Sequence, residues 1–156
     1  MSQTFLTKRR PTKRESWVLG LVDYHAERSR DTSTKVGAIV TSSDNVLVST
    51  GWNDFPRGVN DDLPERRERP LKYFWTEHAE RNAIYNAGRS GVSLVGCWMY
   101  IRWFPCCDCA RAIIQSGIIR VYCSEPDWGT PKWGEQFGES LQMMIEASVE
   151  IVFLEE

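Results

Sequence analysis

The chain has 156 residues, of which 42% are hydrophobic and 26% are charged, and its formal net charge is −2 at pH 7. This length suits one domain with a real core, and the composition excludes a disordered chain and a disulfide-stapled miniature. The slightly negative charge argues against a surface built to hold nucleic-acid phosphates, so no polynucleotide partner is expected. No apolar run approaches the roughly 20 residues that cross a bilayer, and no secretory signal is recognisable, so we expect a cytoplasmic protein without a membrane partner.

The N-terminal stretch is strongly basic. Five of its residues are cationic: Lys8, Arg9, Arg10, Lys13 and Arg14. Terminal segments of this kind are commonly solvated, so we interpret residues 1–14 as a flexible basic arm without function. No internal repeat and no linker divides the chain, and we therefore expect residues 1–156 to form a single domain.

Beyond this arm, a helix and a hairpin are predicted. Residues 15–30 carry charges on one side and a stripe of large side chains on the other, which indicates an amphipathic helix. That stripe consists of Trp17, Leu21, Tyr24 and Arg28. The β-branched runs 35–42 and 46–53 flank the turn-forming residues 43–45, which indicates a β-hairpin.

A long loop is predicted at residues 54–77, because this segment contains three prolines, dense charge and no clean hydrophobic period. Loops of more than about 15 residues inside compact domains are usually functional or disordered. This one ends in the aromatic residues Tyr73, Phe74 and Trp75, directly before the segment that holds His78. Its aromatic end suggests a lid or an interface, and the alternative is a mobile surface insertion.

The rest of the chain alternates between helices and strands. Helices are predicted at 77–88, 106–116 and 135–147, and strands at 95–103, 118–124 and 149–154. Parallel neighbours need a crossover of about a dozen residues, which the last helix provides between the last two strands. We therefore expect these two strands to be parallel.

The cysteine pattern points to reduced thiols. There are five cysteines, an odd number, so a set of structural disulfides is not expected. In the stretch "PCCDCAR", Cys106 and Cys109 have the C-x-x-C spacing that places two sulfurs on one side of a tight turn. This spacing is typical of a metal site with further ligands elsewhere, or of a thiol redox pair that works alone.

His78 and Glu80 supply what a metal site at these cysteines needs. His78 and Cys106 both fall at predicted helix starts, where the helix dipole favours thiolates, the form of cysteine that binds zinc. One imidazole and two thiolates are three protein ligands, and a catalytic zinc keeps its fourth position for water. Cys107 is the obvious alternative fourth ligand, but its side chain should point elsewhere. Glu80 could then reach the open position and move a proton without binding the metal.

At this point a family resemblance becomes plain. The segment "HAERNAI" followed by "PCCDCARAIIQSG" resembles the zinc-dependent cytidine and deoxycytidylate deaminase superfamily. The segments "TKVGAIV", "STGWN", "MYIRWFPCCDCARAIIQSGI" and "VYCSEPDW" follow the order of the deoxycytidylate deaminase branch. The resemblance implies an α/β fold in three layers, α/β/α, with a mixed five-stranded sheet, helices on both faces and parallel last two strands.

The resemblance also implies roles for individual residues. It implies Zn²⁺ as the cofactor, held by His78, Cys106 and Cys109. It implies Glu80 as the catalytic proton shuttle, and Asn53 as a contact to the sugar or base of the substrate, with Ala79 as a further substrate-binding residue.

Two residues depart from the family pattern. Trp103 and Phe104 precede Pro105, where relatives commonly carry a small or hydroxyl-bearing residue. These rings either face the substrate and reshape its pocket, or they pack into the core at the end of a strand.

The function expected from the resemblance is hydrolytic deamination of an aminated nucleobase with release of ammonia, first of all dCMP to dUMP. The alternatives are another aminated heterocycle, such as a nucleoside, free base or pterin, a noncatalytic zinc-stabilised interaction module, and a dithiol redox protein.

Arg89 is either a phosphate or interface contact or a surface arginine at a helix end. Seven tryptophans in so short a chain exceed what its core readily encloses, so a homo-oligomer is expected.

Overall fold

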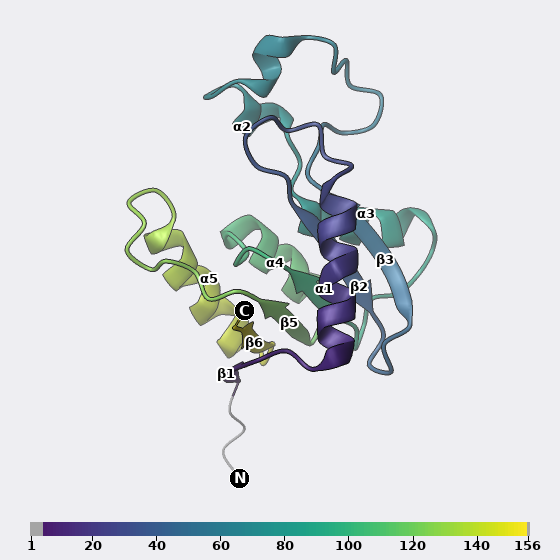
Figure 1. Cartoon of the computed structure of the whole chain (residues 1–156), viewed down its shortest axis with the longest axis vertical. Helices are drawn as coiled ribbons and strands as arrows, with labels where there is room; N and C mark the ends of the chain where they lie inside the picture. Colours follow the sequence, from purple (N-terminus) through teal and green to yellow (C-terminus); the bar gives the residue numbers. More distant parts are fainter. Residues whose placement is uncertain (1–4, 156) are drawn as a thin grey trace.

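A computed structural model describes residues 5–155, and a six-stranded sheet forms its centre (Figure 1). The strands are β1 (Leu6–Arg9), β2 (Gly37–Thr41), β3 (Leu47–Trp52), β4 (Trp98–Ile101), β5 (Arg120–Cys123) and β6 (Glu150–Leu154). Their spatial order is β1-β6-β5-β4-β2-β3. The hairpin strand β2 pairs antiparallel with β3 and β4, whereas β4, β5, β6 and β1 run parallel to one another.

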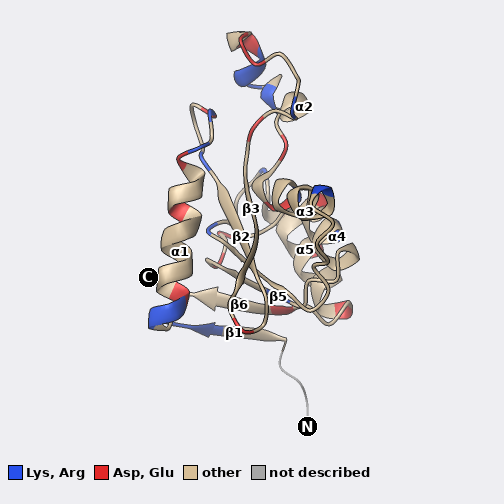
Figure 2. Cartoon of the chain, turned by 90° about the vertical axis from the view of Figure 1, so that its right-hand side faces the viewer, with Lys and Arg blue, Asp and Glu red and all other residues tan. Residues whose placement is uncertain are grey.

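Helices cover both faces of this sheet. They are α1 (Lys13–Ala26), α2 (Lys72–Trp75), α3 (Ala79–Arg89), α4 (Cys107–Gln115) and α5 (Gly134–Glu146), with a 3-10 turn at Pro64–Arg67. Figure 2 shows α1 on one side of the sheet and α3, α4 and α5 on the other. This arrangement confirms the expected three-layer fold with parallel last two strands.

The core lies in two parts, one on each face, because the central strands are buried on both sides. On the α1 face, Val18 and Val22 pack with Ile39, and Tyr100 stacks on Tyr122 with ring centroids 4.3 Å apart. On the other face, the core consists of small and aliphatic residues of α3, α4 and α5 packed on alternate strand positions, among them Ala83, Ile113, Met144, Val40, Met99 and Ile151.

Two expectations were wrong. The sheet has six strands instead of five, and the described part of the expected flexible arm contains a strand and the start of a helix. Leu6–Arg9 forms β1 and pairs in parallel with Ile151–Leu154 of β6, and α1 already begins at Lys13. Arg9 donates hydrogen bonds of 2.7 and 2.8 Å to Glu15, so the basic residues serve as an edge strand and its anchor. Residues 1–4 of the predicted arm lie outside the described part.

The buried face of α1 also differs from the prediction. Trp17 and Tyr24 are 62% and 73% exposed, while Val18, Leu19 and Val22 face the sheet. Both sets recur at helical spacing, but the aliphatic set is the one that packs on Ile39 of β2 and Tyr100 of β4. The predicted hairpin, by contrast, is confirmed, with Asn45 at positive φ (68°) in its turn.

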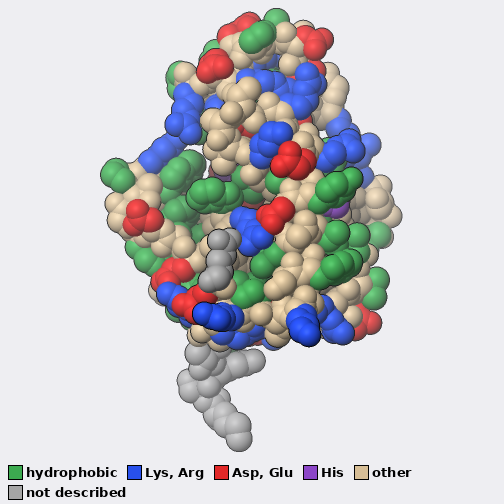
Figure 3. Space-filling model, in the orientation of Figure 1, with side chains coloured by type: hydrophobic (Ala, Val, Ile, Leu, Met, Phe, Trp, Pro, Cys, Tyr) green, Lys and Arg blue, Asp and Glu red, His purple; other side chains and the backbone are tan. Residues whose placement is uncertain are grey.

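Segment 54–77 projects at one end of the molecule, and Figure 3 shows charged side chains of both signs over it. It is a loop apart from the 3-10 turn and α2, in agreement with the prediction. In the part of the chain that the structure describes, no helix has the length and apolar character needed to span a membrane.

Candidate active site

Two helix N-termini meet at the candidate site. His78 is the N-cap of α3, with extended backbone (φ −77°, ψ 153°), and Cys106 is the N-cap of α4 (φ −70°, ψ 171°). Neither side chain caps its own helix, so both are free to point at a shared position. Cys109 lies in the first turn of α4 and is fully buried. The sequence places these residues at helix starts because Pro105 and the end of segment 54–77 precede them.

The edge strand β3 fixes where α3 begins. A Cβ atom on Gly51 would lie 2.3 Å from the carbonyl oxygen of Ala79, so only glycine allows this approach. Asn82 and Asn86 of α3 donate side-chain hydrogen bonds of 2.8 and 2.7 Å to the carbonyl oxygens of Trp52 and Thr50. The helix therefore satisfies backbone groups of the edge strand and is held in one register on it.

The three predicted metal ligands converge. The ligand atoms of His78, Cys106 and Cys109 lie within 4.8 Å of one another, and Nδ1 of His78 lies 3.5 Å from each sulfur. With Zn–N distances of about 2.0–2.1 Å and Zn–S distances of about 2.3 Å, a tetrahedral site places the nitrogen roughly 3.6 Å from each sulfur. The donor set and its spacing therefore fit a tetrahedral metal ion.

Cys107 does not complete this group. Its Sγ lies 3.2 Å from the backbone carbonyl oxygen of Gln136 and donates to it. Among residues 5–155, the cluster of possible metal ligands consists of the one histidine and the two other cysteines. A fourth position is thus left for a group that is not supplied by this cluster.

The electrostatics of the site favour a thiolate at Cys106, close to a buried carboxyl group. The hydrogen bond from Cys109 and the neighbouring His78 lower the pKa of Cys106 to about 4, so this sulfur is a thiolate at neutral pH. A hydrogen bond with that thiolate raises the pKa of His78. Burial raises the pKa of Glu80, whose side chain lies in the first turn of α3 and is 5% exposed.

A charged bridge that sequence reasoning missed joins the two helix starts. Arg81 donates to Glu77 through Nε (2.5 Å) and lies 3.3 Å from a carboxylate oxygen of Asp108. Glu77 also accepts from the backbone N–H of His78 at 3.0 Å. The i,i+4 spacing of Glu77 and Arg81 was the available signal, since such pairs face each other on a helix.

Asn53 directly follows β3, and its side-chain amide already forms hydrogen bonds within the protein. Its Oδ1 accepts from the N–H of Val36 (2.7 Å), and its Nδ2 donates to the carbonyl oxygen of Thr34 (2.9 Å). The second hydrogen of Nδ2 has no partner within residues 5–155. The side chain of Ala79 is fully buried, so only its backbone is available to a substrate.

The two rings before Pro105 point in different directions. Phe104 is 4% exposed and packs against Trp128, Phe137 and Phe153, with ring centroids 5.7, 5.7 and 5.8 Å away. Phe104 thus packs in the core, one of the two expected alternatives, and its contact with a substrate stays a prediction. Trp103 is 60% exposed, because successive residues of an extended chain alternate sides.

Arg89 lies far from this site along α3. Ten residues separate it from Ala79 at the start of the helix, a rise of about 15 Å. Its side chain is exposed. Within its own chain Arg89 is thus a surface arginine at a helix end, and the alternative of a phosphate or interface contact stays a prediction.

Comparisons with known proteins point to one family. The family model described as "Cytidine and deoxycytidylate deaminase zinc-binding region" matches residues 12–125. A protein of Aliivibrio fischeri described as an uncharacterized deaminase in the luxG 3′ region is 44% identical over 127 residues, which cover 81% of this chain and 83% of that protein. The deoxycytidylate deaminase of Homo sapiens is 46% identical over 101 residues, which cover 62% of this chain and 56% of the human protein. This chain thus matches little more than half the length of the human relative.

The fold is shared with solved structures. The apo crystal structure of dCMP deaminase from the cyanophage S-TIM5 superposes with a TM-score of 0.72 and 23% sequence identity, over 92% of this chain and 99% of that one. At this level of sequence identity, the similarity is evidence for a shared fold only.

Proposed function

The chain belongs to the cytidine and deoxycytidylate deaminase family, and on this basis we propose that it converts dCMP and water to dUMP and ammonia. The observation that supports this proposal most directly is the convergence of His78 Nδ1 and two cysteine sulfurs beside the buried carboxyl group of Glu80. A hydrolytic deaminase needs a metal site with an open position and a proton carrier that does not itself bind the metal.

We infer that His78, Cys106 and Cys109 hold zinc. One imidazole nitrogen and two thiolates at this separation are a typical three-ligand set for a catalytic zinc, whereas a structural zinc usually has four protein ligands. When bound, the metal supplies an activated water molecule for attack on the amine-bearing ring carbon. The position of Cys107 supports the open site over a closed, purely structural one.

Glu80 is the proposed proton carrier. Its carboxyl group is buried and, within residues 5–155, forms no ion pair with a lysine or arginine; His78 and a hydrogen bond with Cys109 only partly offset the effect of burial on its pKa. The raised pKa brings the group closer to neutral pH, where a side chain can both take and return a proton. We propose that Glu80 takes the two protons of the attacking water in turn, and delivers one to the ring nitrogen and one to the departing amine, which leaves as ammonia.

Asn53 and Ala79 are the proposed contacts to the substrate. The unpaired Nδ2 hydrogen of Asn53 can donate to the sugar or base, and the first backbone N–H groups of α3 have no partner within that helix. Trp103 is exposed at the end of β4 and is available to cover a bound base.

The substrate can be tested by ammonia release from a panel of dCMP, cytidine, cytosine and an aminopterin. We expect dCMP to have the highest kcat/KM. Equal turnover of cytidine and dCMP would contradict recognition of the phosphate. If only bases or pterins are turned over, the proposed nucleotide substrate is wrong, but the proposed hydrolytic deamination still holds.

We further propose a cytoplasmic homo-oligomer. The five cysteines form no disulfide in the structure, and the proposed ligand set requires two of them in reduced form. The cytoplasm keeps thiols reduced, which supports this compartment. Large side chains remain on the surface of the single chain, including Trp17, Tyr24, Phe74 and Trp103 at 62%, 73%, 82% and 60% exposure. Figure 3 shows hydrophobic side chains exposed over α1. Such residues are enriched where two protein surfaces meet.

A further inference from the structure

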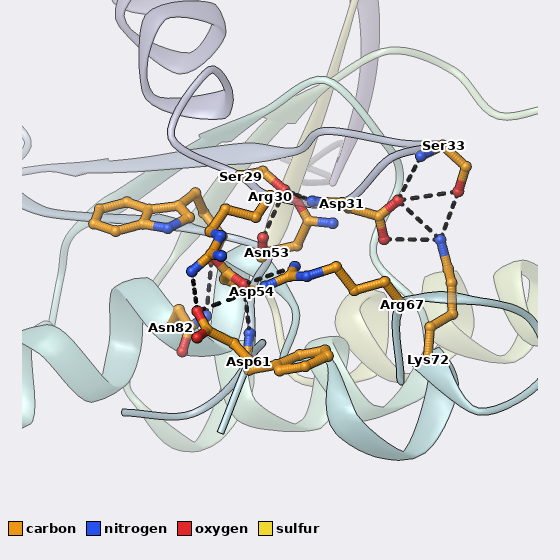
Figure 4. A network of polar contacts seen from close by, with 12 residues as sticks. Ser29, Arg30, Asp31, Ser33, Asn53, Asp54, Asp61, Arg67, Lys72 and Asn82 are labelled. Carbon is orange, nitrogen blue, oxygen red and sulfur yellow. Dashed lines mark hydrogen bonds and ion pairs between the residues drawn. The ribbon is translucent and has the colours of Figure 1, made fainter. Parts of the chain in front are cut away.

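A buried ion pair joins two segments that lie far apart in the chain. Lys72, from α2, and Asp31, from segment 27–36 before β2, are each 7% exposed. The ammonium nitrogen of Lys72 lies 2.7 and 3.0 Å from the two carboxylate oxygens of Asp31 and 2.6 Å from Oγ of Ser33 (Figure 4). The pair thus ties the aromatic end of segment 54–77 to segment 27–36.

Neither charged group of this pair is free to bind a substrate. An ammonium group has three N–H donors, and Lys72 has three acceptors within hydrogen-bond distance. Oδ1 of Asp31 also accepts from the backbone N–H groups of Ser33 (2.8 Å) and Thr34 (2.9 Å). A buried pair is a weak source of net stability, because desolvation of two charges offsets their attraction. The carboxylate of Asp31 instead connects Lys72 to the backbone of Ser33 and Thr34.

That backbone in turn holds Asn53. The carbonyl oxygen of Thr34 and the N–H of Val36 bind the two ends of the Asn53 amide, at 2.9 and 2.7 Å. Ser29 Oγ donates to the carbonyl oxygen of Asn53 at 2.7 Å and accepts from the N–H of Asp31 at 3.2 Å. Figure 4 shows the part of this network that runs from Lys72 through Asp31 and Ser29 to Asn53.

The same network reaches the segment before the candidate metal site. Asp54, which follows Asn53, forms a two-way backbone bridge with Glu77, with N to O distances of 3.2 and 2.8 Å. Glu77 directly precedes His78. The orientation of the Asn53 amide relative to the start of α3 is therefore set by both ends of segment 54–77.

We propose that the Lys72–Asp31 pair is a positioning device for the substrate site, which fixes residues 31–36 so that the free Nδ2 hydrogen of Asn53 points to the bound nucleotide. This inference rests on the proposed function. Lys72 and Asp31 are positioning residues and not catalytic ones, since they act through Asn53. Misplacement of such a contact by about 1 Å can lower the rate by about 100-fold.

The test is a double-mutant cycle on kcat/KM for dCMP. Lys72→Met with Asp31→Asn removes both charges, and the new amide oxygen can still accept from the N–H groups of Ser33 and Thr34, so the double variant folds even if Lys72→Met alone does not. We expect kcat/KM to fall by about 10- to 100-fold with unchanged zinc content. In an Asn53→Ala background the same change should have little further effect. An equal loss in both backgrounds would overturn the proposal and indicate a general structural role.

Arg30→Gln is the matched control, because the exposed Arg30–Asp61 ion pair joins the same two segments. We expect this variant to stay within about twofold of the wild-type kcat/KM, since exposed pairs contribute little. If wild-type protein releases no ammonia from dCMP, the proposed function fails. Amide hydrogen exchange of Thr34 and Val36 then decides the anchoring role: faster exchange in the double variant supports it, and unchanged exchange overturns it.

Discussion

Glu80 stands apart from the two other buried acidic residues of the described chain. Glu15 and Asp31 each pair with a cation, Arg9 and Lys72, and each has a pKa of about 2. Burial raises the pKa of Glu80, and no lysine or arginine within residues 5–155 offsets that effect. A carboxyl group with a raised pKa beside a candidate metal site is typical of acid-base catalysis.

Glu80→Gln should therefore separate chemistry from metal binding. The substitution keeps the size of the side chain and removes its titratable group, so we expect turnover to fall by at least about 10³-fold. Zinc content and thermal stability should change little. Metal analysis of the purified variant checks this, and loss of the metal would make Glu80 a ligand and contradict the proposed mechanism.

Cys106→Ser should have the opposite pattern. It removes a thiolate that lies 3.5 Å from His78 Nδ1, so we expect loss of the metal together with activity, and a lower melting temperature, because metal-binding energy is partly folding energy. Cys107→Ser is the control, since this sulfur points to the backbone of Gln136. A variant of Cys107 that loses zinc would show that the site is closed by four protein ligands.

At the level of elements, two glycines of the hairpin let helices approach from opposite faces. A Cβ atom on Gly37 would lie 2.1 Å from the carbonyl oxygen of Val22 in α1, and one on Gly51 would lie 2.3 Å from that of Ala79 in α3. These obstacles are backbone atoms, which cannot rotate away. The hairpin thereby sets the distance of α3, and with it His78 and Glu80, from the sheet.

Gly51→Ala should displace α3 from β3. We expect the free energy of unfolding to fall by about 2 kcal/mol or more, with a loss of activity, because overpacking strains both elements. Gly88→Ala is the matched control within α3, since nothing lies within 4 Å of the added Cβ. It should stabilise the helix by about 0.5–1 kcal/mol. Chemical denaturation of both variants checks the sign of each change.

The anchor between β1 and α1 should make stability depend on pH. Hydrogen bonds from Arg9 lower the pKa of Glu15 to about 2, against the effect of burial. The folded state thus holds this proton less tightly than the unfolded chain, so the stabilisation is full above about pH 4.5 and disappears as the pH falls towards 2. Relative to Glu15→Gln, wild-type protein should gain about 1–2 kcal/mol at pH 6 and nothing near pH 2. A difference that does not vary with pH would contradict this assignment.

At the level of the whole molecule, the exposed large side chains are spread over many elements, among them α1, segment 54–77, α3 and the end of β4. Tyr73 also lies under the ammonium group of Lys132, 3.5 Å from its ring centroid, so segment 54–77 touches the loop that leads to α5. Segment 54–77 and the loop before α5 therefore meet at the surface although they are distant in the sequence.

Light scattering tests the proposed assembly. We expect a mass that is a multiple of 18.0 kDa at micromolar concentration, because association would cover rings such as Trp17 and Tyr24. A monomeric mass under these conditions would refute the homo-oligomer.

Features that depend on neighbouring residues could be read from the sequence. Apart from β1 and the short α2, the order of helices and strands follows from short-range patterns such as hydrophobic period. The parallel last two strands follow from crossover length, and the family from the spacing in "HAE" and "PCCDC". The three candidate metal ligands could also be named, because helix starts at His78 and Cys106 direct both side chains to a common position.

Tertiary structure alone decided what depends on contacts between distant segments. Residues 6–9 form a strand only because β6 offers a free edge, and α1 buries its aliphatic face because that face matches the sheet better than the aromatic one. Phe104 turns inward because Trp128, Phe137 and Phe153 surround it. No local pattern pairs Lys72 with Asp31, 41 residues away, since a buried ion pair forms only when folding removes both groups from water together.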